Sequence, residues 1–499
     1  MDILYYFAVV FREPLLMLLV GIGTFAGVYI GAIPGLSGTM AISLLVSLTF
    51  GWPVNNAIAI MVGVFVGVVY GGARPSILLN IPGAPSAVAT GVDGYPLAKK
   101  GLAGKAMGIS AISSFFGTLV GIVALAVFAP PISTIALNFR SVDYLMLAFI
   151  GLMMAGSLGS KTMSRGVIVG AIGLFIGTIG IDPQTAVRRF TFDMTYLNAG
   201  VDFVVAMVGL FGASEALMQI SDKHSKPIKQ DVKKIVPSWK ENLQHFPVTI
   251  RSSIVGILVG ALPGAGGDVA ALLSYDQAKR TVKNPTAPFG EGAIEGIIAP
   301  ETANSAAVGG AFIPMLTMGI PGDAVTAVLI SALFIHGLRP GPGFINQTPH
   351  FFYMIISLLV FAAIFLLIAG LTGIKIFTKI VEIPKGILMP IILILSVIGS
   401  FAMRNNVFDV VWMFGFGFIG YLLKKFDYPI APIILGLILS TLFENNLRRA
   451  VMLEGSLPGV ITGIFTSPIS IFLFVFVISL MVTQTNLYKN WRAKSRKDT

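Results

Sequence analysis

Four ionisable residues lie in stretches that are otherwise apolar enough for a membrane: Arg74, Asp268, Glu301 and Asp323. A charged side chain is costly inside a bilayer, so such residues usually face a cavity or a partner and mark a functional site. Arg74 could bind a carboxylate of an anionic substrate through two parallel hydrogen bonds. The alternative is an internal ion pair between Arg74 and one of the three acids.

The three acids are candidates for binding a coupling cation. Glu301 lies in the run APETANSAA, three residues before Asn304, which places both on one face of a helix. Its carboxylate could bind Na⁺ or carry a proton. Asp268 and Asp323 each follow a Pro-Gly pair by a few residues. Helix N-capping is the alternative role for these two aspartates.

Small polar residues cluster where proline and glycine interrupt the apolar runs. The stretch Gly71–Asp93, GGARPSILLNIPGAPSAVATGVD, is too rich in proline and glycine for a continuous spanning helix. A second copy of its core, IPMLTMGIPGDAVTAV, covers Ile313–Val328. Such breaks are tolerated in a membrane only where protein or a water-filled cavity satisfies the freed backbone groups.

The ends of broken helices offer two kinds of ligand. A half-helix that begins inside the membrane points N–H groups at an anion, and one that ends there offers carbonyl oxygens to Na⁺. Close helix packing is the alternative role for small residues at these positions. With Arg74, the residues that we predict to bind substrate are Ser37, Thr39, Ser76, Asn80, Pro82, Gly83, Ser86, Gly264, Gly266, Asn304, Ser305, Pro321, Gly322 and Thr326; Thr90 and Thr317 lie beside the breaks.

The elements that position these residues must be membrane helices. Of 499 residues, 55% are hydrophobic and 11% are charged, whereas a soluble chain carries about 25% charged residues. Successive long apolar runs predict an all-α polytopic membrane protein with roughly 12 transmembrane helices. The net charge of +11 fits positively charged cytoplasmic loops, so we do not expect nucleic acid as a partner. The start of the chain lacks the basic region of a cleavable signal.

The chain also contains an internal duplication. GAIPGLSGT at 31–39 matches GALPGAGGD at 260–268, and the offset between their prolines is 263 − 34 = 229. The two Ile-Pro-Gly triplets are offset by 321 − 82 = 239. We predict a first transmembrane repeat over 1–220, a basic cytoplasmic linker over 221–251, a second repeat over 252–485 and a basic tail over 486–499. The short runs 40–50 and 269–274 leave the parity of crossings open, and we favour inverted repeats.

Two repeats with paired broken helices are typical of secondary transporters, whose site lies where the repeats meet. No nucleotide-binding, hydrolase or metal-ligand motif occurs in the sequence. We therefore expect no enzyme activity and no cofactor other than a coupling ion, Na⁺ or H⁺. An intramembrane enzyme acting on a lipid, with the three acids as its catalytic groups, and a passive channel remain alternatives.

Several long motifs in order resemble the TctA family, the large membrane subunit of bacterial tripartite tricarboxylate transporters. They include GAIPGLSGT, LPGAGG, APETANSAAVGGAFIPML, MGIPGDAVTAVLI and IHGLRPGP. The resemblance implies a solute:cation symporter of the inner membrane that imports small organic anions such as di- or tricarboxylates. It also implies two partners, a periplasmic solute-binding protein that delivers the substrate and a small membrane subunit.

The sequence departs from the family pattern at two places. At the first, Ala73 replaces a hydroxyl residue of the family pattern, and Arg74-Pro75 introduces a charge and a kink. At the second, Asp268 stands where the family usually has a neutral residue. Both departures lie at the predicted site, so they are expected to affect which solute is recognised. Arg74 and Asp268 could instead neutralise each other between the repeats.

Overall fold

A computed structural model describes residues 2–33, 36–80, 82–158, 163–182, 185–221, 239–373 and 385–484. Pro34 and Gly35 of the motif at 31–39, and Ile81 of the first Ile-Pro-Gly triplet, lie outside the described residues. So do residues 222–238 of the predicted linker and the whole predicted tail over 486–499.

By its contacts the chain divides into two compact units, Met1–Ser133 with Val204–Tyr421, and Thr134–Phe203 with Leu422–Thr499. The predicted boundaries of the repeats follow sequence repetition rather than contacts, and they stay a prediction.

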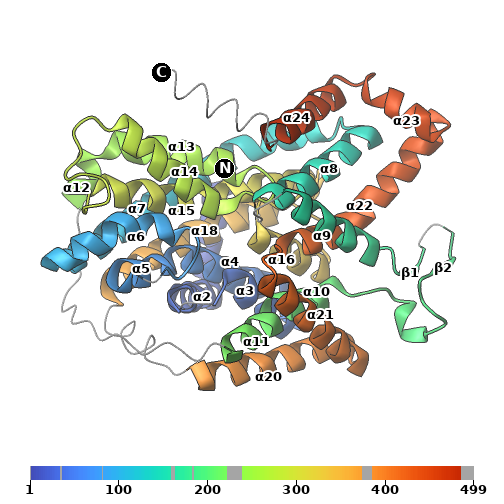
Figure 1. Ribbon diagram of the computed structural model, residues 1–499, viewed down its shortest axis with the longest axis horizontal. Coiled ribbons are helices and arrows are strands. Elements are labelled where there is room, and N and C mark those ends of the chain that lie inside the picture. The colour runs from blue at the N-terminus through green and yellow to red at the C-terminus, as the bar shows by residue number, and fades with distance from the viewer. Residues whose placement is uncertain are drawn as a thin grey trace. The chain divides into compact units, whose positions relative to one another are not determined.

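The first unit is built from helices, most of which Figure 1 labels. Those of its N-terminal segment are α1 (Asp2–Arg12), α2 (Pro14–Ala32), α3 (Gly38–Leu48), α4 (Val54–Gly71), α5 (Ala73–Leu79), α6 (Ala87–Leu97) and α7 (Ala103–Ala136), with a π-helical turn at Ala98–Leu102. Those of its second segment are α10 (Phe203–Met207), α11 (Ser214–Ser221), α12 (Trp239–Gln244), α13 (Phe246–Gly260), α14 (Gly266–Thr281), α15 (Glu295–Met318), α16 (Ala324–Ile335), α17 (Phe344–Gln347), α18 (Pro349–Thr372), α20 (Lys385–Arg404) and α21 (Val407–Lys425), with a π-helical turn at Val208–Ala213.

The second unit adds helices and a small hairpin. Its elements are α8 (Ser141–Leu158), α9 (Met163–Ile176), β1 (Gly180–Ile181), β2 (Arg188–Arg189), a 3₁₀ turn at Thr195–Leu197, α22 (Ala431–Glu454), α23 (Leu457–Ile464) and α24 (Pro468–Gln484). The strands are antiparallel, with Gly180 opposite Arg189. Asp182, Arg189, Glu444 and Arg448 form ion pairs that connect this hairpin to α22.

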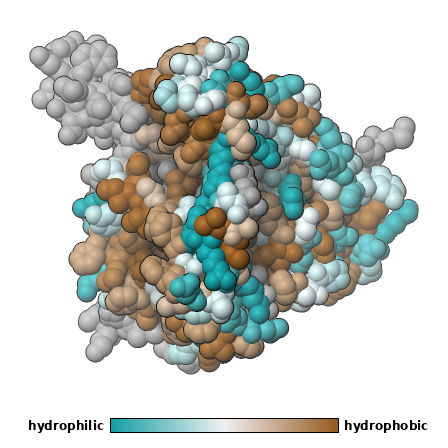
Figure 2. Space-filling model, turned by 90° about the vertical axis from the view of Figure 1, so that its right-hand side faces the viewer, coloured by the Kyte–Doolittle hydropathy of each residue, from teal (hydrophilic) through white to brown (hydrophobic). Residues whose placement is uncertain are grey.

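The helical content and the apolar helices confirm an all-α polytopic membrane protein. Among the described residues, five helical segments are long and apolar enough to cross a membrane, or six if α23 and α24, bent by 90°, form one broken span. The predicted number of about 12 crossings stays a prediction. On the face drawn in Figure 2, hydrophobic side chains cover much of the surface, as lipid contact requires, and a band of hydrophilic residues interrupts them.

Close contacts between helices recur at equivalent positions of the two predicted repeats. A Cβ atom at Gly27 of α2 would lie 2.4 Å from the carbonyl oxygen of Val64, and one at Gly256 of α13 would lie 2.3 Å from that of Ala303. The glycines differ by 256 − 27 = 229 and their partners by 303 − 64 = 239, the two offsets found in the sequence. Small residues let the backbones of membrane helices approach this closely. The duplication is therefore also present in the packing.

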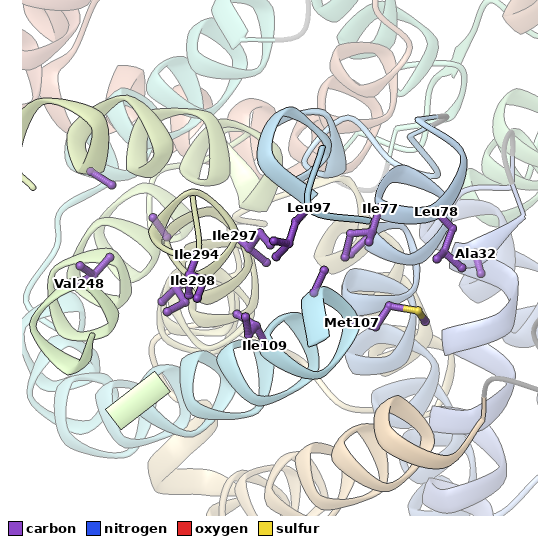
Figure 3. Packing of buried hydrophobic residues seen from close by; sticks show 14 of the residues in the cluster. Ala32, Ile77, Leu78, Leu97, Met107, Ile109, Val248, Ile294, Ile297 and Ile298 are labelled. Atoms are coloured by element: carbon purple, nitrogen blue, oxygen red, sulfur yellow. The ribbon is translucent and has the colours of Figure 1, made fainter. Parts of the chain in front are cut away.

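The elements around the predicted site share one hydrophobic core. Ile77 and Leu78 of α5, Leu97 of α6 and Met107 of α7 belong to a buried cluster with residues of α13 and α15 (Figure 3). Side chains from both repeats fill this cluster, because Ile294, Ile297 and Ile298 pack into it from the region where α15 begins. Burial of this apolar surface fixes α5 and α6 relative to α15.

Helix α14 extends into a polar stretch of the chain. Residues 275–291 have the composition of a loop, but α14 continues to Thr281. An exposed pair between Asp276 and Arg280, one helical turn apart, lies in this segment. Its charged residues therefore form the end of a helix rather than a connection.

Candidate functional site

The two stretches with an Ile-Pro-Gly triplet both interrupt helices in the structure. At the first break α5 ends at Leu79, Asn80 adopts the left-handed conformation, and α6 begins at Ala87. At the second break α15 ends at Met318, Gly319 is left-handed, and α16 begins at Ala324. Asn80 and Gly319 are equivalent by the offset 319 − 80 = 239. The left-handed residue ends each helix in the manner of a C-cap.

Each break faces a helix of the other repeat. The backbone N–H of Ser86, at the start of α6, donates to the Asp268 carboxylate of α14 over 2.9 Å. On the other side, a Cβ atom at Gly38, the first residue of α3, would lie 3.4 Å from the Val325 side chain in the first turn of α16. Since α3 corresponds to α14 and α6 corresponds to α16, the two contacts form a matched pair between the repeats.

Aspartates cap both half-helices that begin at the breaks. Asp323 is the N-cap of α16, where its carboxylate accepts the N–H of Thr326 over 2.7 Å while the Thr326 hydroxyl accepts the N–H of Asp323. This reciprocal arrangement is a capping box. Asp268 accepts an N–H of the helix in the other repeat instead, and its charge interacts with that of Asp323. Asp323 is thus an N-cap, whereas Asp268 lies in the first turn of α14, does not cap that helix and bonds to the start of α6 instead.

Glu301 joins the repeats through a set of hydroxyl groups. Its buried carboxylate accepts hydrogen bonds from Thr90 of α6 over 2.5 Å, and from Ser110 and Ser114 of α7 over 2.9 and 3.0 Å. The described contacts surround the Glu301 carboxylate with hydroxyl oxygens, and an ionisable residue in this setting is typical of ion pathways. Binding of a coupling ion at Glu301 stays a prediction.

The residues that follow Glu301 on α15 pack against the other repeat. The side-chain amide of Asn304 donates to the carbonyl of Val69 near the end of α4 over 2.9 Å. Its Oδ1 atom lies so close to Gly267 that a Cβ atom there would be 2.2 Å away. The hydroxyls of Thr302 and Ser305 are buried and make no hydrogen bond to the described part of the protein.

The side chain of Arg74, near the start of α5, contacts the C-terminal end of another helix. Its Nη2 atom donates to the carbonyl oxygens of Ala369 and Gly370 in the last turn of α18, over 2.5 and 3.2 Å. Its guanidinium also lies 5.3 Å from the centre of the Tyr70 ring. A cation is favourable there, since the C-terminus of a helix carries partial negative charge. Arg74 is 1% exposed, so its predicted contact with substrate stays a prediction.

The predicted site residues differ in accessibility. Those with exposed or half-buried surface at the breaks are Ser37, Asn80, Pro82, Gly83, Gly264, Asp268 and Asp323. Those buried in protein are Thr39, Arg74, Ser76, Ser86, Gly266, Glu301, Asn304, Ser305, Pro321, Gly322 and Thr326. Several buried members have internal partners, such as Ser76, whose hydroxyl donates to the carbonyl of Ala87 over 2.5 Å.

Sequence reasoning missed three polar residues near the site. Ser110 and Ser114 are four residues apart on an apolar helix, a spacing that places both on one face and could have revealed them. Asp93 is fully buried and accepts the N–H groups of Gly290, Gly292 and Ala293. It attaches α6 to the loop before α15, and this long-range contact gives no local signal in the sequence.

Comparisons with known proteins agree with the sequence motifs. The model of the tripartite tricarboxylate transporter TctA family matches residues 17–435. An Agrobacterium vitis protein described as "Uncharacterized 52.8 kDa protein in TAR-I ttuC' 3'region" is 37% identical over 439 residues, which cover 87% of this chain and 86% of that protein. A second, described as "Uncharacterized protein in TAR-II ttuC' 3'region", is 40% identical over 215 residues, 43% of this chain and 87% of that protein. No solved structure matches the chain.

Proposed function

The chain belongs to the tripartite tricarboxylate transporter TctA family, and on that premise we propose that it is the permease subunit of a solute:cation symporter. It imports a small organic anion, a di- or tricarboxylate, together with Na⁺ or H⁺. Membership of the family makes it a component of a transporter. The symport, the coupling ion and the class of substrate are the parts that we propose.

The contact of Glu301 with Thr90, Ser110 and Ser114 is the observation that carries the proposal. It brings a carboxylate from the second predicted repeat against hydroxyls from the first. Binding or release of a cation at Glu301 changes the charge at the junction of α15 with α6 and α7. Alternating access needs such a link, because an ion must bias how the repeats pack against each other.

The substrate would bind at the accessible part of the two breaks. Ser37 caps α3 through the N–H of Met40 and is half-buried, so its hydroxyl can also reach a ligand. Asn80 is exposed at the end of α5. Backbone and hydroxyl donors of this kind suit a carboxylate. A coupling cation offsets part of the negative charge of Asp268 and Asp323, which would otherwise repel an anion.

The family also supports proposals about partners and location. We place the chain in the bacterial inner membrane, with a small membrane subunit beside it. A periplasmic solute-binding protein would deliver the anion to the outer opening of the permease.

Transport by the reconstituted complex tests the proposal. Proteoliposomes that contain the chain and the small subunit, supplied with the binding protein, should accumulate labelled malate or citrate under an inward Na⁺ or H⁺ gradient. Liposomes without the chain are the control. Uptake that only equilibrates the solute and ignores both gradients would contradict symport and indicate a channel.

A further inference from the structure

Asp268 is unusual among the site residues because it is charged, exposed and bound to the opposite repeat. One carboxylate oxygen, Oδ1, accepts the N–H of Ser86 over 2.9 Å. The residue as a whole is nevertheless exposed, so the described part of the protein does not enclose Asp268 completely. An ionised carboxylate offers acceptors only, with room for several hydrogen bonds.

The internal repeat shows what Asp268 replaces. Its equivalent in the first repeat is Thr39, since 268 − 39 = 229. Thr39 is buried and uncharged, so the second repeat alone carries a negative charge at this position. The two halves of the site therefore differ in charge at matched places.

The N–H that Asp268 accepts belongs to the start of a broken helix. The start of such a helix attracts anions, and here a carboxylate of the protein occupies one of its donors. Asp323 holds the corresponding place at α16 and interacts electrostatically with Asp268. A substrate carboxylate that approaches the breaks therefore meets two acids. Without these acids, N–H groups at the starts of α6 and α16 would be free to bind it.

We propose that Asp268 determines substrate specificity by standing in for one substrate carboxylate and accepting a hydrogen bond from a hydroxyl or ammonium group of the substrate. The substrate class is then a small acid with at most two carboxyl groups and at least one such donor. This inference rests on the proposed transport of organic anions and specifies which of them the permease selects.

Direct binding to the purified full-length chain tests the proposal without the selectivity of a binding protein. Four acids form a matched set: malate and succinate carry two carboxyl groups with and without a hydroxyl, and citrate and tricarballylate carry three. Their Kd values are measured by ligand-dependent thermal shift at saturating Na⁺ and fixed pH. We expect the hydroxyl to improve binding by on the order of tenfold, as for a hydrogen bond to a charged group. We also expect malate to bind more tightly than citrate.

Two variants separate the charge from the hydrogen bond. Asp268→Asn keeps an acceptor for Ser86 and removes the charge, so the preference for the hydroxyl should fall to about twofold or less and citrate should gain affinity. Asp268→Thr restores the residue of the first repeat and leaves the Ser86 N–H available, so tricarballylate should gain most. Asp276→Asn, which removes an exposed acid from the same helix, is the control and should preserve the Kd ratios of the wild type.

The outcomes distinguish the role of Asp268 from the proposed transport. Unchanged ratios among the four Kd values in both Asp268 variants would overturn the role of Asp268 and leave the proposed transport intact. A shift of equal size in Asp276→Asn would also overturn it, because general charge would then explain the effect. Failure of all four acids to bind any of the proteins would overturn the proposed function itself.

Discussion

Asn80 and Gly319 end the helices before the two breaks in the same left-handed conformation, with φ angles of 56° and 71°. They lie 239 residues apart, the offset that also relates the two Ile-Pro-Gly triplets. Asparagine and glycine are the residues that adopt this conformation most readily. One backbone geometry therefore forms both breaks, although the residues that form it differ.

Substitution at these two positions should have unequal effects. Asn80→Gly preserves the left-handed turn and should leave thermal stability in detergent nearly unchanged. Gly319→Ala should destabilise the protein by about 1–2 kcal/mol for the conformation alone. The new Cβ atom would also lie 2.9 Å from the carbonyl oxygen of Pro340. Equal melting temperatures for Gly319→Ala and the wild type would contradict the equivalence of the two turns.

The breaks themselves could be predicted because proline and glycine act locally. The Ile-Pro-Gly triplets follow the left-handed residues directly, so sequence alone located both interruptions within a few residues. The extent of α14 was harder to predict, since the charged run ending at Thr281 resembles a loop in composition. Tertiary packing of its apolar face decides that it is helical.

Close packing of α2 on α4 and of α13 on α15 predicts a second pair of matched effects. Gly27→Ala and Gly256→Ala would each place a Cβ atom against a backbone carbonyl and should cost about 1–3 kcal/mol of stability. The control is Gly415→Ala in α21, where a Cβ atom would meet no heavy atom within 4 Å. Melting temperatures in detergent provide the comparison. Tolerance of only one of the two substitutions would show that the packing of the repeats is not equivalent.

The cap on α16 can be separated from a role of Asp323 in ion coupling. Asp323→Ala removes the cap and should cost about 1 kcal/mol, whereas Asp323→Ser keeps an acceptor for the Thr326 N–H and should retain most of the stability. Thermal unfolding of the purified variants measures this difference. If Asp323 also binds the coupling ion, Asp323→Ser should fold normally and yet lower gradient-driven uptake. Equal instability of the two variants would argue against the capping box.

The partners of the charged residues could not be predicted from the sequence. Arg74 donates to carbonyls of α18, and Asp268 accepts an N–H from α6. Both contacts join segments far apart in the chain, and neither residue type indicates a backbone partner. The sequence indicated correctly that these charges need compensation in a membrane. It left open whether another charge or a helix end would supply that compensation.

Glu301 is the residue on which the proposed coupling depends most directly. Glu301→Gln keeps the shape of the side chain but cannot lose or gain the charge, so an ion gradient should no longer drive the transport cycle. Exchange of substrate between the two sides at equal ion concentrations should continue, because it needs no net movement of the coupling ion. The matched control is Glu291→Gln, at an exposed glutamate in the loop before α15.

The most direct measurement is accumulation of labelled malate or citrate in proteoliposomes with the binding protein and an inward Na⁺ or H⁺ gradient. For Glu301→Gln we predict a loss of accumulation of at least about tenfold, equivalent to about 1.4 kcal/mol, with exchange preserved and Glu291→Gln unaffected. Accumulation by Glu301→Gln at the level of the wild type would contradict coupling at Glu301.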